Sequence, residues 1–201
     1  MRRERELRIV AGRWRGRRWR FPDPGAAASE LRPTPDRVRE TLFNWLQNRT
    51  AGARCLDLFA GSGALGLEAH SRGAASVVFV DSDTRTARAL RELLSAWEAA
   101  NAHVELRPAA DYLAQRGRVA MGQFDLVFLD PPFAAGLLES TARMLIDGNW
   151  LADGALIYVE NARSDGEPAL PATWERLKTG NAGAVSYHLY RFQLLAKASP
   201  T

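Results

Sequence analysis

The order of apolar and polar positions predicts alternating helices and strands from residue 34 onward. Thr34 is a helix-capping residue type, and Pro35 after it suits a first helical position. Val38, Leu42 and Leu46 then fall on one helical face. Further helices are expected over 63–72, 84–99 and 136–147. Short apolar runs predict strands over 54–60, 76–81, 103–107, 124–130 and 155–160, and residues 174–196 favour an antiparallel strand pair.

This alternation predicts an α/β fold of the Rossmann-like, doubly wound type, in which the sheet is mostly parallel. Most of the expected strands are continuous apolar runs, which is typical of a sheet covered by helices on both faces. Ligands of such sheets bind beyond the carboxyl ends of the strands, where the strand order reverses. The residues that end the strands are therefore the candidates for a functional site.

The N-terminal segment differs from the remainder in charge. Residues 1–20 contain nine arginines and two glutamates, whereas the whole chain carries a net charge of only +4. Arginine interleaved with Trp14, Trp19 and Phe21 is typical of a nucleic-acid-binding segment. The alternating pattern over 8–21 also predicts a β-hairpin. We therefore expect a basic hairpin and a Pro/Gly/Ala-rich linker over 1–33, and a second domain over 34–201.

Composition excludes several classes of protein. A hydrophobic content of 46% over 201 residues argues against disorder as the dominant state. No apolar run approaches the roughly 18 residues of a membrane-spanning helix. The single cysteine, Cys55, cannot form an intramolecular disulfide, which favours a cytoplasmic protein. The three histidines lack metal-ligand spacing, so no metal is expected.

A glycine-rich turn is expected directly after the first strand of the sheet. Gly61, Gly63 and Gly66 match GxGxxG, and Asp81 ends the next strand 20 residues after Gly61. This spacing is that of a dinucleotide fingerprint, and it fits another adenosine cofactor equally well. Asp57 distinguishes the two, because a carboxylate there would repel a pyrophosphate and attract a cationic ligand. S-adenosylmethionine, with an ammonium and a sulfonium group, is such a ligand.

The turn after the fourth strand points to methylation of an amine. It reads Asp130-Pro131-Pro132-Phe133, and two consecutive prolines make a stiff turn without backbone donors. The carboxylate and a proline carbonyl can accept both hydrogens of an exocyclic base amine, while Phe133 offers a stacking face. Polarising these N–H bonds makes the nitrogen a better nucleophile, and the carboxylate can receive its proton.

Together these segments resemble the bacterial ribosomal small subunit methyltransferase D family, across residues 8–195. The resemblance is carried by the sequences GRWRGR, LRPTPDRVRETLFNWL, LDLFAGSGALGLEA, FDLVFLDPPF and WLADGALIYVE. It implies a class I S-adenosylmethionine-dependent methyltransferase fold with an RNA-binding hairpin. It also implies that the N2 atom of guanine 966 of 16S rRNA is methylated in the assembled 30S subunit, by a monomeric enzyme.

The resemblance also implies roles for individual residues. The residues expected at the cofactor are Asp57, Phe59, Gly61, Ser62, Gly63 and Asp81, with the backbone of Ala109 and Ala110 against the adenine. The catalytic residues are expected to be Asp130, Pro131, Pro132 and Phe133. The residues expected to bind RNA are Arg13, Trp14, Arg15, Arg17 and Arg18, together with Arg37 and Arg39 before the first strand. Relatives often place a polar residue against the adenine, where this chain has Pro108 and Ala109.

Other functions remain open at this stage, and one of them is a pure RNA-binding module, which would leave the acids at the strand ends unexplained. The motif around Asp130 also permits methylation of adenine N6 in DNA or RNA. An NAD-dependent oxidoreductase would use the glycine-rich turn and would require no function of Asp130.

Overall fold

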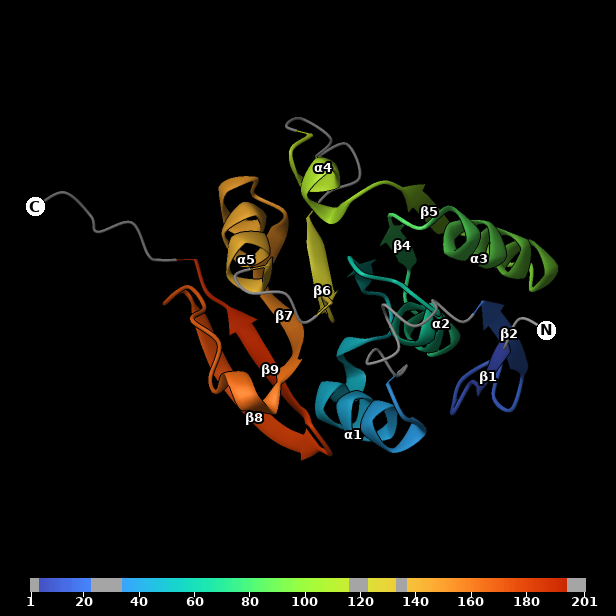
Figure 1. Ribbon diagram of the computed structural model, residues 1–201, viewed down its shortest axis with the longest axis horizontal. Helices are drawn as coiled ribbons and strands as arrows, with labels where there is room; N and C mark the ends of the chain where they lie inside the picture. Colours follow the sequence, from blue (N-terminus) through green and yellow to red (C-terminus); the bar gives the residue numbers. More distant parts are fainter. Residues whose placement is uncertain (1–3, 23–33, 116–122, 133–136, 195–201) are drawn as a thin grey trace, which may run out of the picture.

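The fold is built on one mixed sheet. The structure, a computed structural model, describes residues 4–22, 34–115, 123–132 and 137–194. Within these residues the sheet has the strand order β5-β4-β3-β6-β7-β9-β8 (Figure 1). The parallel strands are β3 (Arg54–Asp57), β4 (Ser76–Asp81), β5 (Ala102–Leu106), β6 (Phe124–Leu129) and β7 (Leu151–Ala162). The antiparallel strands are β8 (Trp174–Ala182) and β9 (Val185–Phe192). The predicted doubly wound sheet with an antiparallel C-terminal pair is confirmed.

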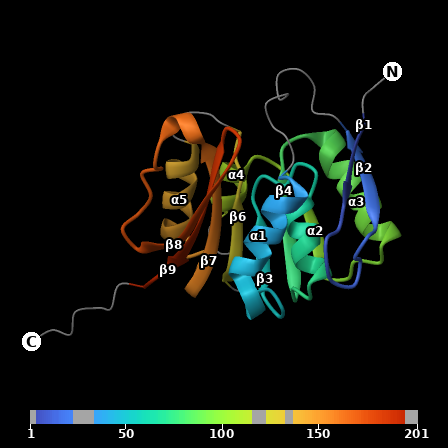
Figure 2. The same cartoon turned by 90° about the horizontal axis from the view of Figure 1, so that it is seen from below.

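Helices cover both faces of the sheet (Figures 1 and 2). One face carries α1 (Asp36–Leu46), α2 (Ala64–Ser71) and α3 (Thr84–Ala96), and the other carries α4 (Ala109–Leu113) and α5 (Leu137–Asp147). Two short 3-10 turns are also present, Gln47–Arg49 and Arg163–Asp165. Successive strand residues face opposite sides: Leu126 and Phe128 enter one core, and Val127 and Leu129 enter the other. This explains why the strands are continuous apolar runs.

Some boundaries differ from the predicted ones. Strand β3 ends at Asp57, because the chain then leaves the sheet toward the glycine-rich turn. Strand β7 begins at Leu151 instead of residue 155, because its pairing with β6 continues to Phe124 across a register shift that places extra residues in β7. Thr34 does not cap α1. The N-cap is Pro35, and the Thr34 hydroxyl donates instead to the Glu160 carboxylate at 2.9 Å.

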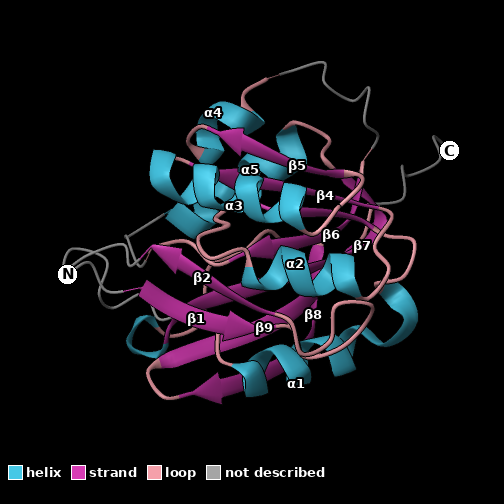
Figure 3. Ribbon diagram, turned by 90° about the vertical axis from the view of Figure 1, so that its right-hand side faces the viewer, coloured by secondary structure: helices cyan, strands magenta, loops and turns pink. Residues whose placement is uncertain are grey.

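The N-terminal hairpin is present, and it is packed on the sheet domain. Strands β1 (Glu4–Arg8) and β2 (Arg18–Pro22) are antiparallel and lie beside α2 and α3 (Figure 3). The buried residues of the hairpin join the core that contains α1, α2 and α3; they are Ile9, Trp14, Trp19 and Phe21. The predicted division at residue 33 therefore does not separate two independent cores. The linker expected over 23–33 lies outside the described residues.

Candidate active site

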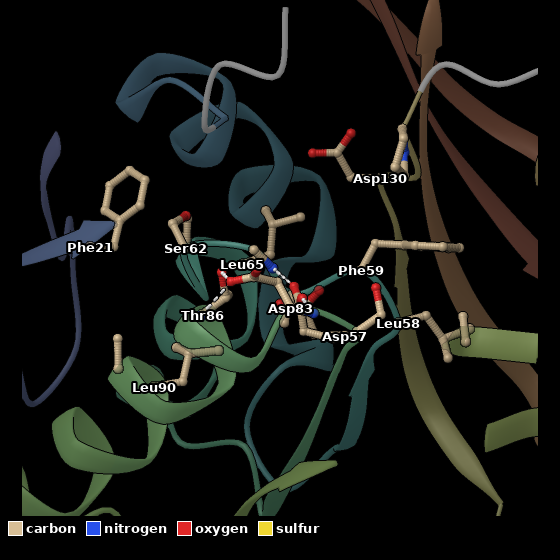
Figure 4. A pocket seen from close by; sticks show the side chains of 18 of the residues that line it. Phe21, Asp57, Leu58, Phe59, Ser62, Leu65, Asp83, Thr86, Leu90 and Asp130 are labelled. Carbon is tan, nitrogen blue, oxygen red and sulfur yellow. Dashed lines mark hydrogen bonds between the residues drawn. The ribbon is translucent and has the colours of Figure 1, made fainter. Parts of the chain in front are cut away.

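A cavity opens at the carboxyl ends of β3, β4 and β6. Strand β3 lies between β4 and β6, so the strand order reverses there, as the topology predicts for a ligand site. The cavity has a volume of about 560 Å³, enough for a nucleoside-sized ligand. It brings together most of the predicted cofactor and catalytic residues, namely Asp57, Phe59, Gly61, Ser62, Asp81, Ala109, Ala110, Asp130 and Pro132. Figure 4 shows Asp57 and Asp83 at the base of this cavity, with Ser62 and Phe21 on one side.

The glycine-rich turn forms one wall of the cavity. The Gly61 N–H donates to Asp81 Oδ2 at 2.8 Å, and the Gly63 N–H donates to the Ala60 carbonyl at 2.7 Å. Gly63 has a φ of +75°, which favours glycine, and a Cβ there would lie 2.5 Å from Leu90 Cδ2. A side chain at Gly63 would therefore be strained by this backbone conformation and would displace the Leu90 side chain of α3.

Two carboxylates from neighbouring strands lie at the base of this turn. Asp57 is buried, and its Oδ2 accepts the Gly66 N–H at 3.0 Å. Burial raises the pKa of Asp57 to about 7, the charge of Asp81 adds to the rise, and the Gly66 N–H opposes it. Burial also raises the pKa of Asp81, although it accepts the N–H groups of Gly61 and Asp83. A cationic ligand bound beside Asp57 and Asp81 would stabilise their ionised carboxylates.

The third carboxylate, Asp130, follows β6. Burial raises its pKa well above the ordinary value, and the charges of Glu160 and Asp57 add to the rise. Pro131 is buried and Pro132 is exposed at the cavity. Phe133 lies outside the described residues.

Glu160 is a neighbour of Asp130 that the motif analysis did not select. Leu129, the last residue of β6, pairs in register with Val159 of β7. Asp130 follows Leu129 in the chain, and Glu160 follows Val159. Glu160 is buried, and its Oε1 accepts the hydroxyls of Thr34 at 2.9 Å and Tyr158 at 2.8 Å. The position of Glu160 at the end of an expected strand was the only sequence signal for it. Nothing in the sequence indicated that the hydroxyls of Thr34 and Tyr158 donate to Glu160.

Comparison with known proteins decides the family. The sequence profile of a family described as "Conserved hypothetical protein 95" matches residues 7–191. The ribosomal RNA small subunit methyltransferase D of Escherichia coli strain K12 is 49% identical over 187 residues, which cover 92% of this chain and 90% of that protein. The chain belongs to the ribosomal RNA small subunit methyltransferase D family. The resemblance inferred from the motifs is thereby confirmed.

Solved structures agree with the family and with the fold. A structure from Escherichia coli described as a methyltransferase has 46% sequence identity and a TM-score of 0.83, over 94% of this chain and 98% of that one. An RNA methyltransferase from Salinibacter ruber, in complex with S-adenosyl-L-homocysteine, has 14% identity and a TM-score of 0.58, over 84% and 98%. This distant likeness concerns the fold alone. The predicted class I S-adenosylmethionine-dependent methyltransferase fold is confirmed.

The hairpin of this family member exposes arginines and buries its aromatic rings. Arg13, Arg15, Arg17 and Arg18 are exposed, as an RNA-binding surface requires. Trp14 is not available to a base, because the residue is only 4% exposed and its ring stacks on that of His70, with the ring centroids 4.9 Å apart. The expectation that Trp14 contacts RNA is therefore corrected: the alternation of arginine and aromatic residues places the rings inward and the charges outward.

The two arginines expected near the cleft have different environments. Arg37 is exposed, whereas the side chain of Arg39 is fully buried. Arg39 donates to the Arg8 carbonyl at 2.9 Å and forms an ion pair with Asp36, one helical turn before it. Arg39 therefore joins α1 to the hairpin and is not exposed to RNA.

The described part of the chain has neither a membrane-spanning helix nor a metal-binding cluster. No helix in these ranges is long and apolar enough to cross a membrane. The same residues include no cluster of three or more histidine, cysteine or acidic side chains that could hold a metal ion.

Proposed function

We propose that this protein transfers a methyl group from S-adenosylmethionine to the exocyclic N2 atom of a guanine in 16S rRNA, guanine 966 by family resemblance, in the assembled 30S subunit. In this proposal the protein acts as a monomer in the cytoplasm. One observation carries the chemistry: Asp130 and its proline turn line the same cavity as the glycine-rich turn. The cavity thus contains both a site for an adenosine cofactor and, at Asp130, an acceptor for the hydrogens of an amine.

The residues present in the cavity fit S-adenosylmethionine. Asp57 is a buried carboxylate and Asp81 a half-buried one, and the raised pKa of each reflects confined negative charge that a cationic ligand would relieve. Gly61, which has no side chain, and Ser62 line the cavity beside them. Ala109 and Ala110, at the start of α4, line the position expected for the adenine. When bound, the cofactor supplies a methyl group activated by a sulfonium.

Asp130 acts on the nucleophile in this proposal. Its carboxylate accepts an N–H of the target amine, and a carbonyl of the proline turn accepts the second hydrogen. The two bonds orient the nitrogen toward the methyl group. Transfer of the methyl group would break its bond to the sulfonium sulfur, release neutral S-adenosyl-L-homocysteine and leave the nitrogen cationic. Asp130 would then take the proton that the nitrogen loses.

Glu160 would strengthen Asp130 as a base. Its negative charge, stabilised by the hydroxyls of Thr34 and Tyr158, is one cause of the raised pKa of Asp130. A carboxylate with a higher pKa accepts a proton more readily, provided that it is ionised when the substrate binds.

The proposed substrate can be tested by transfer of labelled methyl groups. The acceptors are unmodified 30S subunits, the naked rRNA from them and duplex DNA, each digested to nucleosides after the reaction. We expect label in N2-methylguanosine from the assembled subunits. Label in N6-methyladenine from DNA would overturn the substrate while keeping the mechanism. Absence of label in all three, with measured NAD binding, would favour the oxidoreductase.

The exposed arginines of the hairpin are expected to determine the salt dependence of RNA binding. Each phosphate contact that is lost lowers the magnitude of the slope of log K against log salt by about 0.7–0.9. We therefore expect replacement of Arg13, Arg15 and Arg17 by alanine to lower it by about 2–3 and to weaken binding. Point replacements are preferable to removal of residues 1–20, because the hairpin contributes buried side chains to the core.

A matched control removes the same charge from a different surface. Arg143, Arg163 and Arg191 are exposed on α5, after β7 and on β9, far from the hairpin (Figure 1). Replacing these three by alanine should leave the salt slope nearly unchanged. Equal slopes for the two triple variants would exclude the hairpin as the RNA-binding surface.

A further inference from the structure

The indole of Trp19 connects the hairpin to the cofactor turn. Trp19 lies on β2, yet it lines the cavity, and its Nε1–H donates to the Ser62 carbonyl at 2.9 Å. Trp19 is only 5% exposed, and its ring packs edge-on against that of Trp97 at the α3 C-terminus, with the ring centroids 6.0 Å apart. The donor is therefore held in place by the core and not by the turn alone.

The bond from Trp19 completes the support of one peptide group. The peptide between Ser62 and Gly63 presents its carbonyl to Trp19 and its N–H to the Ala60 carbonyl, at 2.7 Å. Because a peptide group is planar, fixing both ends fixes its orientation. The Gly61 N–H, two residues before that of Gly63, donates to Asp81 Oδ2 at 2.8 Å. Two of these three anchors come from the sheet domain, and the third comes from the hairpin.

We propose that Trp19 is a positioning residue for the cofactor site: its indole N–H sets the orientation of the Ser62–Gly63 peptide, so that the hairpin forms part of the cofactor site as well as presenting arginines. This inference depends on the cofactor of the proposed function and not on the identity of the methylated base. Without the indole N–H, the Ser62 carbonyl loses its partner in a partly buried position. The peptide is then held only through the Gly63 N–H, so its orientation varies more before the ligand binds, and this added freedom weakens binding.

The test replaces Trp19 by phenylalanine, which keeps an aromatic ring and removes the donor. By calorimetry without RNA, the dissociation constant of S-adenosyl-L-homocysteine should rise about 3- to 10-fold, as expected for one lost hydrogen bond. In the ligand-free protein, hydrogen exchange should accelerate at the amides of residues 61–64. In methyl transfer, KM for the cofactor should rise while kcat changes little.

The control is Trp14→Phe, in the same hairpin. Trp14 is also buried, at 4% exposure, but packs on His70 and Trp97 and does not line the cavity. Both variants should lower the melting temperature, and only Trp19→Phe should change ligand affinity and exchange in the turn. Equal ligand affinities for the two variants would overturn the role of Trp19. A failure of guanine methylation would be distinguishable, because calorimetry and exchange use no RNA.

Discussion

Replacing Asp130 by alanine is expected to reduce methyl transfer roughly 100- to 10,000-fold, the range for loss of a group that handles the reacting proton. The variant lacks both the acceptor that orients the amine and the base that receives its proton. Binding of S-adenosyl-L-homocysteine should change by less than about threefold, because its neutral sulfur makes no demand on the Asp130 charge. Single-turnover transfer to 30S subunits and calorimetry with this ligand measure the two quantities separately.

Retention of transfer in the Asp130→Ala variant would contradict the mechanism, and loss of ligand binding would contradict the assignment of Asp130 to the amine.

A second variant, Asp130→Asn, shows whether the fold is intact. Because the pKa of Asp130 is raised in the folded protein, ionisation of Asp130 lowers the stability of the wild type as the pH rises through and above the ordinary range for aspartate. Asparagine does not ionise. The melting temperature of this variant relative to the wild type should therefore increase from about pH 4 to about pH 8.

Replacing Glu68 by alanine is expected to lower the free energy of unfolding by about 2–4 kcal/mol. The Glu68 side chain on α2 is fully buried, and its two oxygens accept the N–H groups of Val10 and Ala11 at 2.8 and 2.9 Å. The same carboxylate forms an ion pair with Arg72 at 2.8 Å. Alanine would leave two hairpin amides without partners. Chemical denaturation measures the loss, and hydrogen exchange at residues 9–18 should accelerate.

The control for Glu68 is another glutamate that pairs with an arginine four residues away. Glu92 pairs with Arg88 on α3 at 2.8 Å, but both side chains are largely exposed, at 65% and 80%. Replacing Glu92 by alanine should change stability by less than about 0.5 kcal/mol, because water screens the exposed pair. If the two replacements have equal effects, the backbone bonds of Glu68 do not hold the hairpin.

Much of the architecture was predictable because it depends on local patterns. The alternation of helices and strands, the antiparallel C-terminal pair and the N-terminal hairpin follow from the periodicity of apolar residues. Boundaries were less predictable where long-range pairing decides them, as at the early start of β7 opposite Phe124. Thr34 illustrates the same limit, since its hydroxyl bonds to Glu160, 126 residues away, instead of capping α1.

The grouping of the motif residues in one cavity was predictable, because short motifs at strand ends carry them. Asp57, the glycine-rich turn, Asp81 and Asp130 meet in one cavity, because the carboxyl ends of parallel strands share one edge of the sheet. The environment of Glu160 was not predictable, because its donors Thr34 and Tyr158 reach it only in the folded chain.

The sequence by itself determined the fold class, the methyltransferase family and the carboxylates of the cavity, because each of these depends on residue types at fixed spacing. Only the tertiary structure decided which arginines and aromatics face solvent. Arg39 and Trp14 belong to segments rich in exposed positive charge, and both are buried because α1, α2 and the hairpin pack against one another. The bond from Trp19 to Ser62 joins residues 43 positions apart, and neither residue type alone indicates it. Burial and long-range hydrogen bonding depend on which surfaces meet, and that is a property of the whole folded chain.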